Sequence, residues 1–405
     1  MRLLLKYLFG FLTKLVIKKY KPTIIGITGS FGKSSTKEAI FTILNPYLKT
    51  RANYLNLNTE IGVPLTIIDG FDARRNIFSW FKNLVKALKL LLFFDFNYPQ
   101  ILVLEMAADQ PKDLKYLTKM FPPKIGVITA IGEMPVHLSH YQNLDELISE
   151  KAQIIQRLKK DGKAILNADC PLVWQLKDQT KAEVIGFGFN EISQVKISDY
   201  KLIQLEEPDQ CGIYFRLEAE GSFVPIKLDG LIGKSNAYAL AAGAACGLSM
   251  GLNLIEINEA INHYQPPPQR LQLKKGKDNI WIIDDSYNAS PDTIQMALET
   301  LNEFQNKRKI AVLGDMLELG ENSEKAHQQL GEKINEYGEV FFAIGENMRL
   351  AYEAAKKKMP EDKICHFSNS EEAKIFIANF VKEGDLVLIK GSRKMKMEEI
   401  VKALS

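Results

Sequence analysis

Glycines, a lysine and serines follow a β-branched run near the start of this 405-residue chain. Residues 23–28 predict a buried strand, and the apolar spacing from Lys33 onward predicts a helix. A strand, a glycine-rich turn and a helix carrying Gly-Lys-Ser form a phosphate-binding loop, in which backbone N–H groups and the helix N-terminus face the anion. The sequence therefore predicts a nucleoside triphosphate site. Its candidate residues here are Thr28, Gly29, Ser30, Gly32, Lys33, Ser34 and Ser35.

A carboxylate follows the next predicted strand. Residues 100–104 predict a strand that ends in Glu105, and residues 124–129 predict another that precedes His137. Ligands of open parallel sheets bind at the carboxyl ends of the strands. Because Mg²⁺ prefers hard oxygen ligands, we expect it at Glu105 and at Ser34 or the neighbouring Ser35, with Lys33 on the terminal phosphates.

Composition limits the class of protein. The chain is 46% hydrophobic and 25% charged, as is usual for a water-soluble protein, and its formal net charge is +3. This charge gives no nucleic-acid footprint at the level of the whole chain. The four cysteines share no CxxC spacing, which disfavours a zinc site or a disulfide framework and favours a reducing cytoplasm.

Three segments are expected along the chain. Residues 1–20 predict an apolar and basic helix, and residues 21–265 an α/β nucleotide-binding domain with a mostly parallel sheet plus a small antiparallel sheet. Pro266-Pro267-Pro268 cannot continue a helix and predicts the main domain boundary. Residues 266–405 alternate strands with helices, which predicts a Rossmann-like α/β domain.

Two apolar stretches carry lysines instead of acidic residues, namely residues 1–20 and 77–94. The first falls short of the roughly 20 apolar residues that span a bilayer. Either stretch could lie on a membrane surface as a basic amphipathic helix, or pack against the rest of the chain or a partner chain.

Six motifs are distributed over nearly the whole chain. They are Thr28-Gly29-Ser30-Phe31-Gly32-Lys33, Asn56 to Pro64, Leu104-Glu105-Met106, Asp284 to Pro291, Leu313 to Gly320 with His327, and Lys390 to Arg393. Together they resemble the Mur ligases, the ATP-dependent amide-forming enzymes of peptidoglycan precursor synthesis. The pair Asp-Asp-Ser-Tyr-Asn-Ala and Gly-Asp-Met-x-Glu-Leu-Gly resembles most the branch that adds D-alanyl-D-alanine to a muramoyl-peptide.

The resemblance implies a reaction and a set of roles. ATP would phosphorylate a substrate carboxylate, and an amine would displace the phosphate. Lys33, Glu105, His137 and Lys151 would be catalytic, with two Mg²⁺ ions held by Ser34, Glu105, His137 and Lys151 as a carbamate. Further ATP contacts would be Asn236, Arg270 and Asp285. Substrate contacts would be Asn58, Thr59, Tyr287, Asn288, Ser392 and Arg393.

Departures from the family leave alternatives open. Ser235 and Ala239 stand where the family usually has His and Asn, and Glu133 and Met134 are extra residues near His137. The uridine-nucleotide-binding domain of the family is not recognisable ahead of the loop. The acceptor could therefore be lipid-linked, or a partner protein could replace that domain, with the enzyme cytoplasmic or at the inner face of the membrane. The remaining alternatives are a Mur-like ligase for another carboxylate and a non-catalytic, membrane-peripheral nucleotide-binding regulator.

Overall fold

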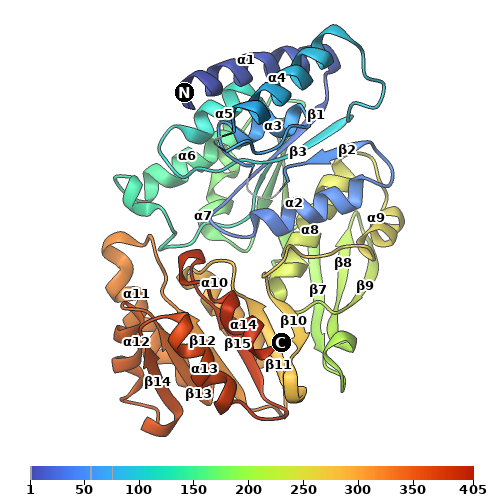
Figure 1. Ribbon diagram of the computed structural model, residues 1–405. Coiled ribbons are helices and arrows are strands. Elements are labelled where there is room, and N and C mark those ends of the chain that lie inside the picture. The colour runs from blue at the N-terminus through green and yellow to red at the C-terminus, as the bar shows by residue number, and fades with distance from the viewer. Residues whose placement is uncertain (1, 55–56, 75) are drawn as a thin grey trace.

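Two sheets organise the chain (Figure 1). The computed structural model describes residues 2–54, 57–74 and 76–405. Over these residues the first sheet has nine strands in the order β2-β3-β1-β4-β5-β6-β7-β8-β9, and the second has six in the order β10-β11-β15-β12-β13-β14. The predicted α/β fold class is confirmed.

The first sheet begins as a parallel sheet buried on both faces. Its strands are β2 (Thr50–Ala52), β3 (Ile101–Glu105), β1 (Thr23–Thr28), β4 (Ile125–Ile128), β5 (Lys163–Asn167) and β6 (Glu183–Gly188). Alternate residues of β1 enter different cores, because successive side chains of a strand point to opposite faces. Ile25 and Ile27 face α2 (Lys33–Leu44), α8 (Lys234–Ser249) and α9 (Leu254–Ile261).

The opposite face of this sheet is covered by five helices and packs through Ile24 and Leu102. These helices are α1 (Arg2–Tyr20), α3 (Gly62–Ile67), α4 (Ile77–Leu92), α5 (Asp113–Met120) and α6 (Leu144–Gln156). None of the helices within the described ranges is long and apolar enough to cross a bilayer.

The small antiparallel sheet predicted within residues 21–265 is present, and it continues the first sheet. Strands β7 (Val195–Ile203), β8 (Gly212–Ala219) and β9 (Ser222–Asp229) pair antiparallel. A short parallel pairing between Phe187 and Val195 joins them to β6. The alternating burial of β8 matches a sheet with one face in the core.

The second sheet is parallel except for its edge strand β10 (Gln272–Lys275). Its other strands are β11 (Trp281–Asp285), β15 (Leu386–Lys390), β12 (Lys309–Gly314), β13 (Val340–Ile344) and β14 (Ile364–Phe367). Helices cover both faces, as β/α alternation predicts. They are α10 (Pro291–Glu303), α11 (Ser323–Lys333) and α12 (Met348–Ala355) on one face, and α13 (Ser370–Phe380) and α14 (Glu398–Leu404) on the other.

Candidate active site

The loop between β1 and α2 has the backbone of a phosphate cradle. Gly29 and Gly32 have φ angles of 149° and 79°, which side-chain-bearing residues rarely adopt. A Cβ at Gly29 would lie 2.1 Å from Thr129 Oγ1, so no other residue fits there. Two buried hydroxyls of the loop, on Thr28 and Ser30, have no hydrogen-bond partner within the described part of the chain. Because such groups are costly to leave unpaired, they indicate a ligand at this loop.

The ammonium group of Lys33 lies over the loop. Its Nζ donates to the carbonyl oxygens of Gly29 at 2.9 Å and Ser30 at 3.2 Å. Burial lowers the pKa of Lys33, although Glu105 and Asp109 oppose this shift. A buried cation without a paired carboxylate is suited to a polyanionic ligand.

Hard oxygen atoms meet beside this lysine. Glu105 is buried at the carboxyl end of β3, where one carboxylate oxygen accepts from Ser34 Oγ at 2.9 Å and the other from Asn58 Nδ2 at 3.1 Å. Arg270 lies just before strand β10 of the second sheet, and its Nη2 donates to Ser34 Oγ at 3.3 Å. Glu105 and Arg270, which are 71 and 236 positions from Ser34 in the sequence, thus both contact the Ser34 hydroxyl.

A strained turn presents Arg270. Its neighbours Gln269 and Leu271 have φ angles of 61° and 50°. The N–H of Leu271 donates to Asp285 Oδ1 at 3.1 Å, which ties the turn to the end of β11. The guanidinium of Arg270 lies 4.3 Å from the ring centroid of Tyr287, a cation–π contact that fixes its direction.

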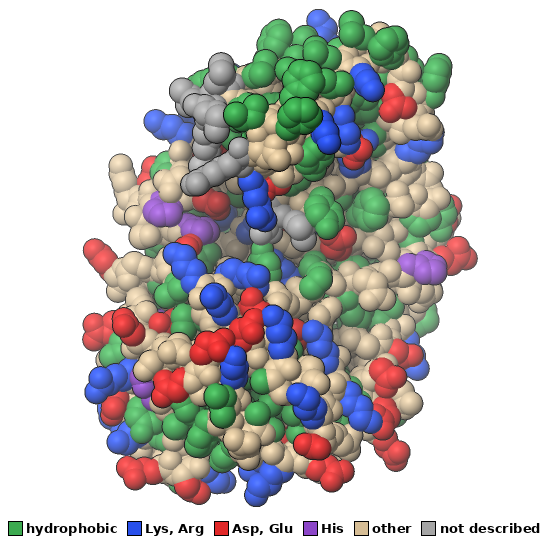
Figure 2. All heavy atoms as spheres, in the orientation of Figure 1, with side chains coloured by type: hydrophobic (Ala, Val, Ile, Leu, Met, Phe, Trp, Pro, Cys, Tyr) green, Lys and Arg blue, Asp and Glu red, His purple; other side chains and the backbone are tan. Residues whose placement is uncertain are grey.

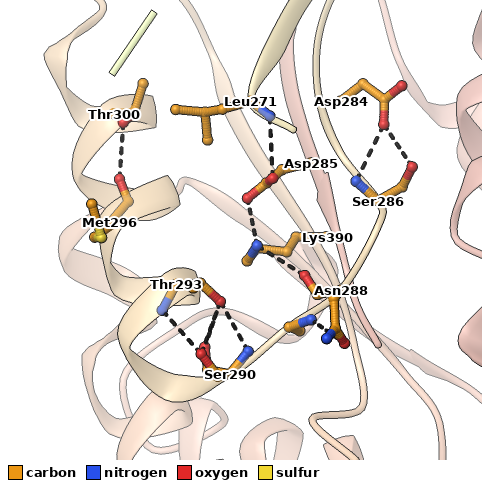
Figure 3. A network of polar contacts seen from close by, with 11 residues as sticks. Leu271, Asp284, Asp285, Ser286, Asn288, Ser290, Thr293, Met296, Thr300 and Lys390 are labelled. Atoms are coloured by element: carbon orange, nitrogen blue, oxygen red, sulfur yellow. Dashed lines mark hydrogen bonds and ion pairs between the residues drawn. The ribbon is translucent and has the colours of Figure 1, made fainter. Parts of the chain in front are cut away.

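Asp285 forms a buried ion pair with Lys390, at the ends of the adjacent strands β11 and β15 (Figure 3). The two charged atoms are 2.5 Å apart, and Lys390 Nζ also donates to the carbonyl oxygen of Asn288 at 3.0 Å. Burial raises the pKa of Asp285 and lowers that of Lys390, and each charge opposes the shift of the other.

These groups line a cavity of about 340 Å³ between the two sheets. Most of the predicted site residues line it, and they come from both halves of the chain. They are Ser30, Gly32, Lys33, Ser34, Ser35, Asn58, Glu105, His137, Asn236, Arg270, Asp285, Tyr287 and Asn288.

Six predicted site residues lie outside this lining: Thr28, Gly29, Thr59, Lys151, Ser392 and Arg393. Thr59 Oγ1 accepts from the N–H of Gly62 at 3.3 Å at the start of α3, and Ser392 Oγ accepts from the N–H of Leu317 at 2.8 Å. Both contacts are structural. Arg393 donates to Gln269 Oε1 at 3.0 Å, near the cavity mouth at Tyr287.

Lys151 and His137 have different surroundings. Lys151 is buried on α6 behind the loop, where its Nζ donates to Gly29 O at 3.1 Å, and burial together with Lys33 lowers its pKa to about 7. His137 has a φ of 68°, and its Nδ1 and Nε2 lie 2.8 Å from Glu318 and 3.6 Å from Asp109. The histidine thus joins the two halves of the chain.

Two charged residues that line this cavity were not among the predicted site residues. Lys390 belongs to a motif that the sequence displays, but its role depends on a strand pairing that is not visible locally. Asp109 follows β3 by four residues and also lines the cavity. The signal for Asp109 was a second carboxylate just past the same strand end.

A second cavity, of about 590 Å³, adjoins the first and shares Phe31, Gly32, Ser235 and Met296 with it. Its other lining residues are more apolar and include Ile131 and Phe187. The loop therefore stands between a charged compartment and a larger, mainly apolar one.

Comparisons with known families agree with this architecture. A family model of the Mur ligase middle domain matches residues 27–247, more than half of the chain, and a model of the Mur ligase glutamate ligase domain matches residues 269–393. The chain belongs to the Mur ligase family. The predictions of the family and of an ATP-dependent ligase are confirmed.

Individual relatives cover most of this Mur ligase. The UDP-N-acetylmuramoyl-tripeptide–D-alanyl-D-alanine ligase of Bacillus subtilis is 29% identical over 97% of this chain and 78% of that protein. The enzyme of the same name from Buchnera aphidicola is 30% identical over 94% of this chain and 75% of that protein.

Solved structures show the same fold. MurF from Acinetobacter baumannii superposes with a TM-score of 0.81 at 25% identity, covering 98% of this chain and 80% of that one. The MurF ligase of Thermotoga maritima in complex with ADP gives a TM-score of 0.78 at 27% identity, covering 98% and 83%.

Proposed function

We propose that this ligase uses ATP to join D-alanyl-D-alanine to the peptide carboxylate of a muramoyl-tripeptide precursor. The observation that carries the proposal is the charged cavity, into which the loop lysine, Glu105 and Arg270 converge from both halves of the chain. The names of the full-length relatives and the ADP bound to the Thermotoga maritima enzyme support it.

The residues suit phosphoryl transfer followed by amide formation. An oxygen of the acceptor carboxylate attacks the γ-phosphorus and ADP leaves. The amine of D-alanyl-D-alanine then attacks the acyl carbon, the C–O bond to phosphate breaks, and the amine loses a proton. Lys33 and Arg270 neutralise charge on the transferring phosphoryl group, and the cavity between the two sheets positions both substrates.

The two adjoining cavities give ATP a direction. Its phosphates lie against the loop in the charged cavity, and its nucleoside extends past Gly32 into the larger cavity. An aromatic base is suited to the apolar lining there. Asn236 lines the phosphate side, although its amide already donates to the Ile232 carbonyl oxygen at 2.8 Å.

Mg²⁺ fits one place in this site. The hydroxyl of Ser34 and the carboxylate of Glu105 are hard oxygen donors 2.9 Å apart, and they would hold Mg²⁺ together with phosphate and water ligands. Bound there, the ion would neutralise phosphate charge. Among the described residues no three His, Cys, Asp or Glu side chains form a group that could hold a metal ion. A second Mg²⁺ ion at His137 and a carbamate on Lys151 therefore stay predictions.

Carbamylation of Lys151 is a further part of the proposal. Carbamate formation needs an uncharged amine, and burial beside Lys33 favours that form. We expect protein equilibrated with ¹³C-bicarbonate to show a carbamate carbon resonance that Lys151→Arg abolishes. Lys163→Arg, at a lysine on the surface of β5, serves as control and should keep the resonance. A resonance unchanged in Lys151→Arg would contradict the assignment.

The reaction is tested by phosphate release from ATP. We expect release when D-alanyl-D-alanine and UDP-muramoyl-tripeptide are both present, little with either alone, and a product whose mass equals that of the two substrates less one water. Release with the dipeptide replaced by a single amino acid, and not with the dipeptide, would overturn the substrate assignment.

The alternatives differ in their acceptor or in having none. A lipid-linked acceptor would give activity only when the UDP-linked peptide is replaced by its lipid-linked counterpart. A partner protein that replaces a precursor-binding domain would be needed for activity on either. A non-catalytic regulator would bind ATP and release no phosphate, and the assembly of Lys33, Glu105 and Arg270 at one cavity argues against it. The cytoplasmic location stays a prediction.

A further inference from the structure

Helices α1 and α4 lie side by side and run in the same direction. The rings of Phe9 and Trp80 are 5.4 Å apart near their beginnings. Near their ends, Lys19 Nζ donates to the carbonyl oxygens of Leu90 at 2.8 Å and Phe93 at 2.6 Å. Because both contacts advance by about ten residues along each helix, the pair forms one continuous layer over the first sheet (Figure 1).

The inner side of this layer packs against the core of the first sheet. On α1, Phe9, Leu12 and Val16 are buried in the core beneath. On α4, only Asn83 and Ala87 are buried. Trp80, Leu84, Leu90 and Leu91 of α4 are partly buried and pack against the same core, so the apolar side chains left on the outer side are the exposed ones.

The outer side of the layer is apolar. Ile77, Phe78 and Leu92 are each 75% exposed, and Phe81 is 60% exposed. Figure 2 shows hydrophobic side chains gathered at the top of the molecule, over α1 and α4, with Lys and Arg side chains between them. Other exposed apolar side chains of this outer surface are Leu8, Phe11, Leu15, Leu88, Phe93, Phe94 and Phe96.

The two helices that carry this surface are basic. Neither α1 nor α4 contains an acidic residue. Within the described part of the chain the side chains of Lys14, Lys18, Lys82 and Lys89 have no hydrogen bond or ion pair, whereas the side chain of Lys19 binds the end of α4. Lysines that stand free beside Phe, Leu and Ile side chains are what a basic, membrane-surface helix presents to anionic lipid.

We propose that the outer surface of α1 and α4 binds the ligase peripherally to an anionic lipid bilayer. Phenylalanine, leucine and isoleucine side chains enter the headgroup boundary, and the free lysines lie against lipid phosphates. A protein partner is a poorer match, since protein interfaces are depleted in lysine and neither helix offers an acidic group for a partner's cations. This inference is independent of the ligase reaction and its substrates.

The test measures co-sedimentation of the full chain with vesicles. Vesicles of equimolar phosphatidylglycerol and phosphatidylcholine should bind the protein more tightly than pure phosphatidylcholine vesicles, and added salt should weaken the difference. We expect Phe78→Ser/Phe81→Ser/Leu92→Ser to lower the partition coefficient at least about tenfold. Lys14→Glu/Lys82→Glu/Lys89→Glu should abolish the preference for phosphatidylglycerol.

A matched control removes exposed apolar side chains elsewhere. Phe223, Ile255 and Ile375 are 55%, 68% and 65% exposed and lie on β9, α9 and α13. Their triple replacement by Ser should leave vesicle binding unchanged. All three variants should keep ATP turnover in the absence of vesicles, which shows that they fold.

Two results would overturn the proposal. The first is wild-type protein that stays in the supernatant with phosphatidylglycerol vesicles, or binds them equally in all variants. The second is a protein that does not bind vesicles but forms a concentration-dependent dimer in sedimentation velocity, which Phe78→Ser/Phe81→Ser/Leu92→Ser dissociates. That result would make this surface an interface between two copies of the chain.

Discussion

Lys33→Met is expected to lower the turnover of ATP by about a thousandfold or more, because it removes the cation that faces the transferring phosphoryl group. The methionine side chain keeps most of the volume of lysine. The loop glycines and the buried hydroxyls of Thr28 and Ser30 remain, so nucleotide affinity should fall much less than turnover. Steady-state phosphate release and nucleotide titration measure the two effects separately.

Stability distinguishes this role from a structural one. Burial lowers the pKa of Lys33, so the folded protein disfavours the charged side chain. Removing the charge relieves that cost, and we expect the melting temperature of Lys33→Met to stay within a few degrees of the wild type. Lys124→Met, at a half-exposed lysine that pairs with Asp161, is the control and should leave both turnover and melting temperature unchanged. A large fall in melting temperature for Lys33→Met would assign the lysine to the fold.

Local sequence patterns were sufficient to predict the strands and helices whose apolar residues follow a regular spacing. The β-branched run of β1 falls at residues 23–28 and the helix α2 begins at Lys33, both as the sequence predicted. Strands of mixed composition were missed, among them β6 and the edge strand β10, because sheet pairing and not propensity determines them. For the same reason the sequence does not show that a two-residue pairing joins the antiparallel strands to β6.

The candidate active site depends on contacts between residues far apart in the sequence more than the individual helices and strands do. Sequence motifs predicted roles for Lys33 and Glu105, and the family resemblance predicted one for Arg270, but neither showed that Arg270 donates to the hydroxyl of Ser34. The resemblance also named Thr59, whose hydroxyl accepts from the local N–H of Gly62, and Ser392, whose hydroxyl accepts from the distant N–H of Leu317. A motif residue can position its neighbours without lining the cavity, and only three-dimensional contacts separate the two roles.

The ion pair between Asp285 and Lys390 gives the second large effect. Lys390→Met leaves the buried Asp285 carboxylate with the N–H of Leu271 as its only donor among the described residues, and it removes the donor to the Asn288 carbonyl. Breaking a buried pair from one side costs about 3–5 kcal/mol, so we expect a loss of that size in the free energy of unfolding, measured by urea denaturation. Lys402→Met, which breaks an exposed pair with Glu399 in the same half of the chain, should change stability little.

A double variant separates the cost of an unpaired charge from the role of the pair in the cavity. Asp285→Leu/Lys390→Met removes both charges and should recover much of the stability lost in Lys390→Met, because no buried carboxylate is left unpaired. Activity should not recover, since Asp285 lines the cavity and its carboxylate holds the turn that presents Arg270 to Ser34. A double variant as unstable as the sum of its single variants would show that the two side chains act independently. Recovered turnover would show that the pair only supports the fold of the second sheet and does not position the arginine.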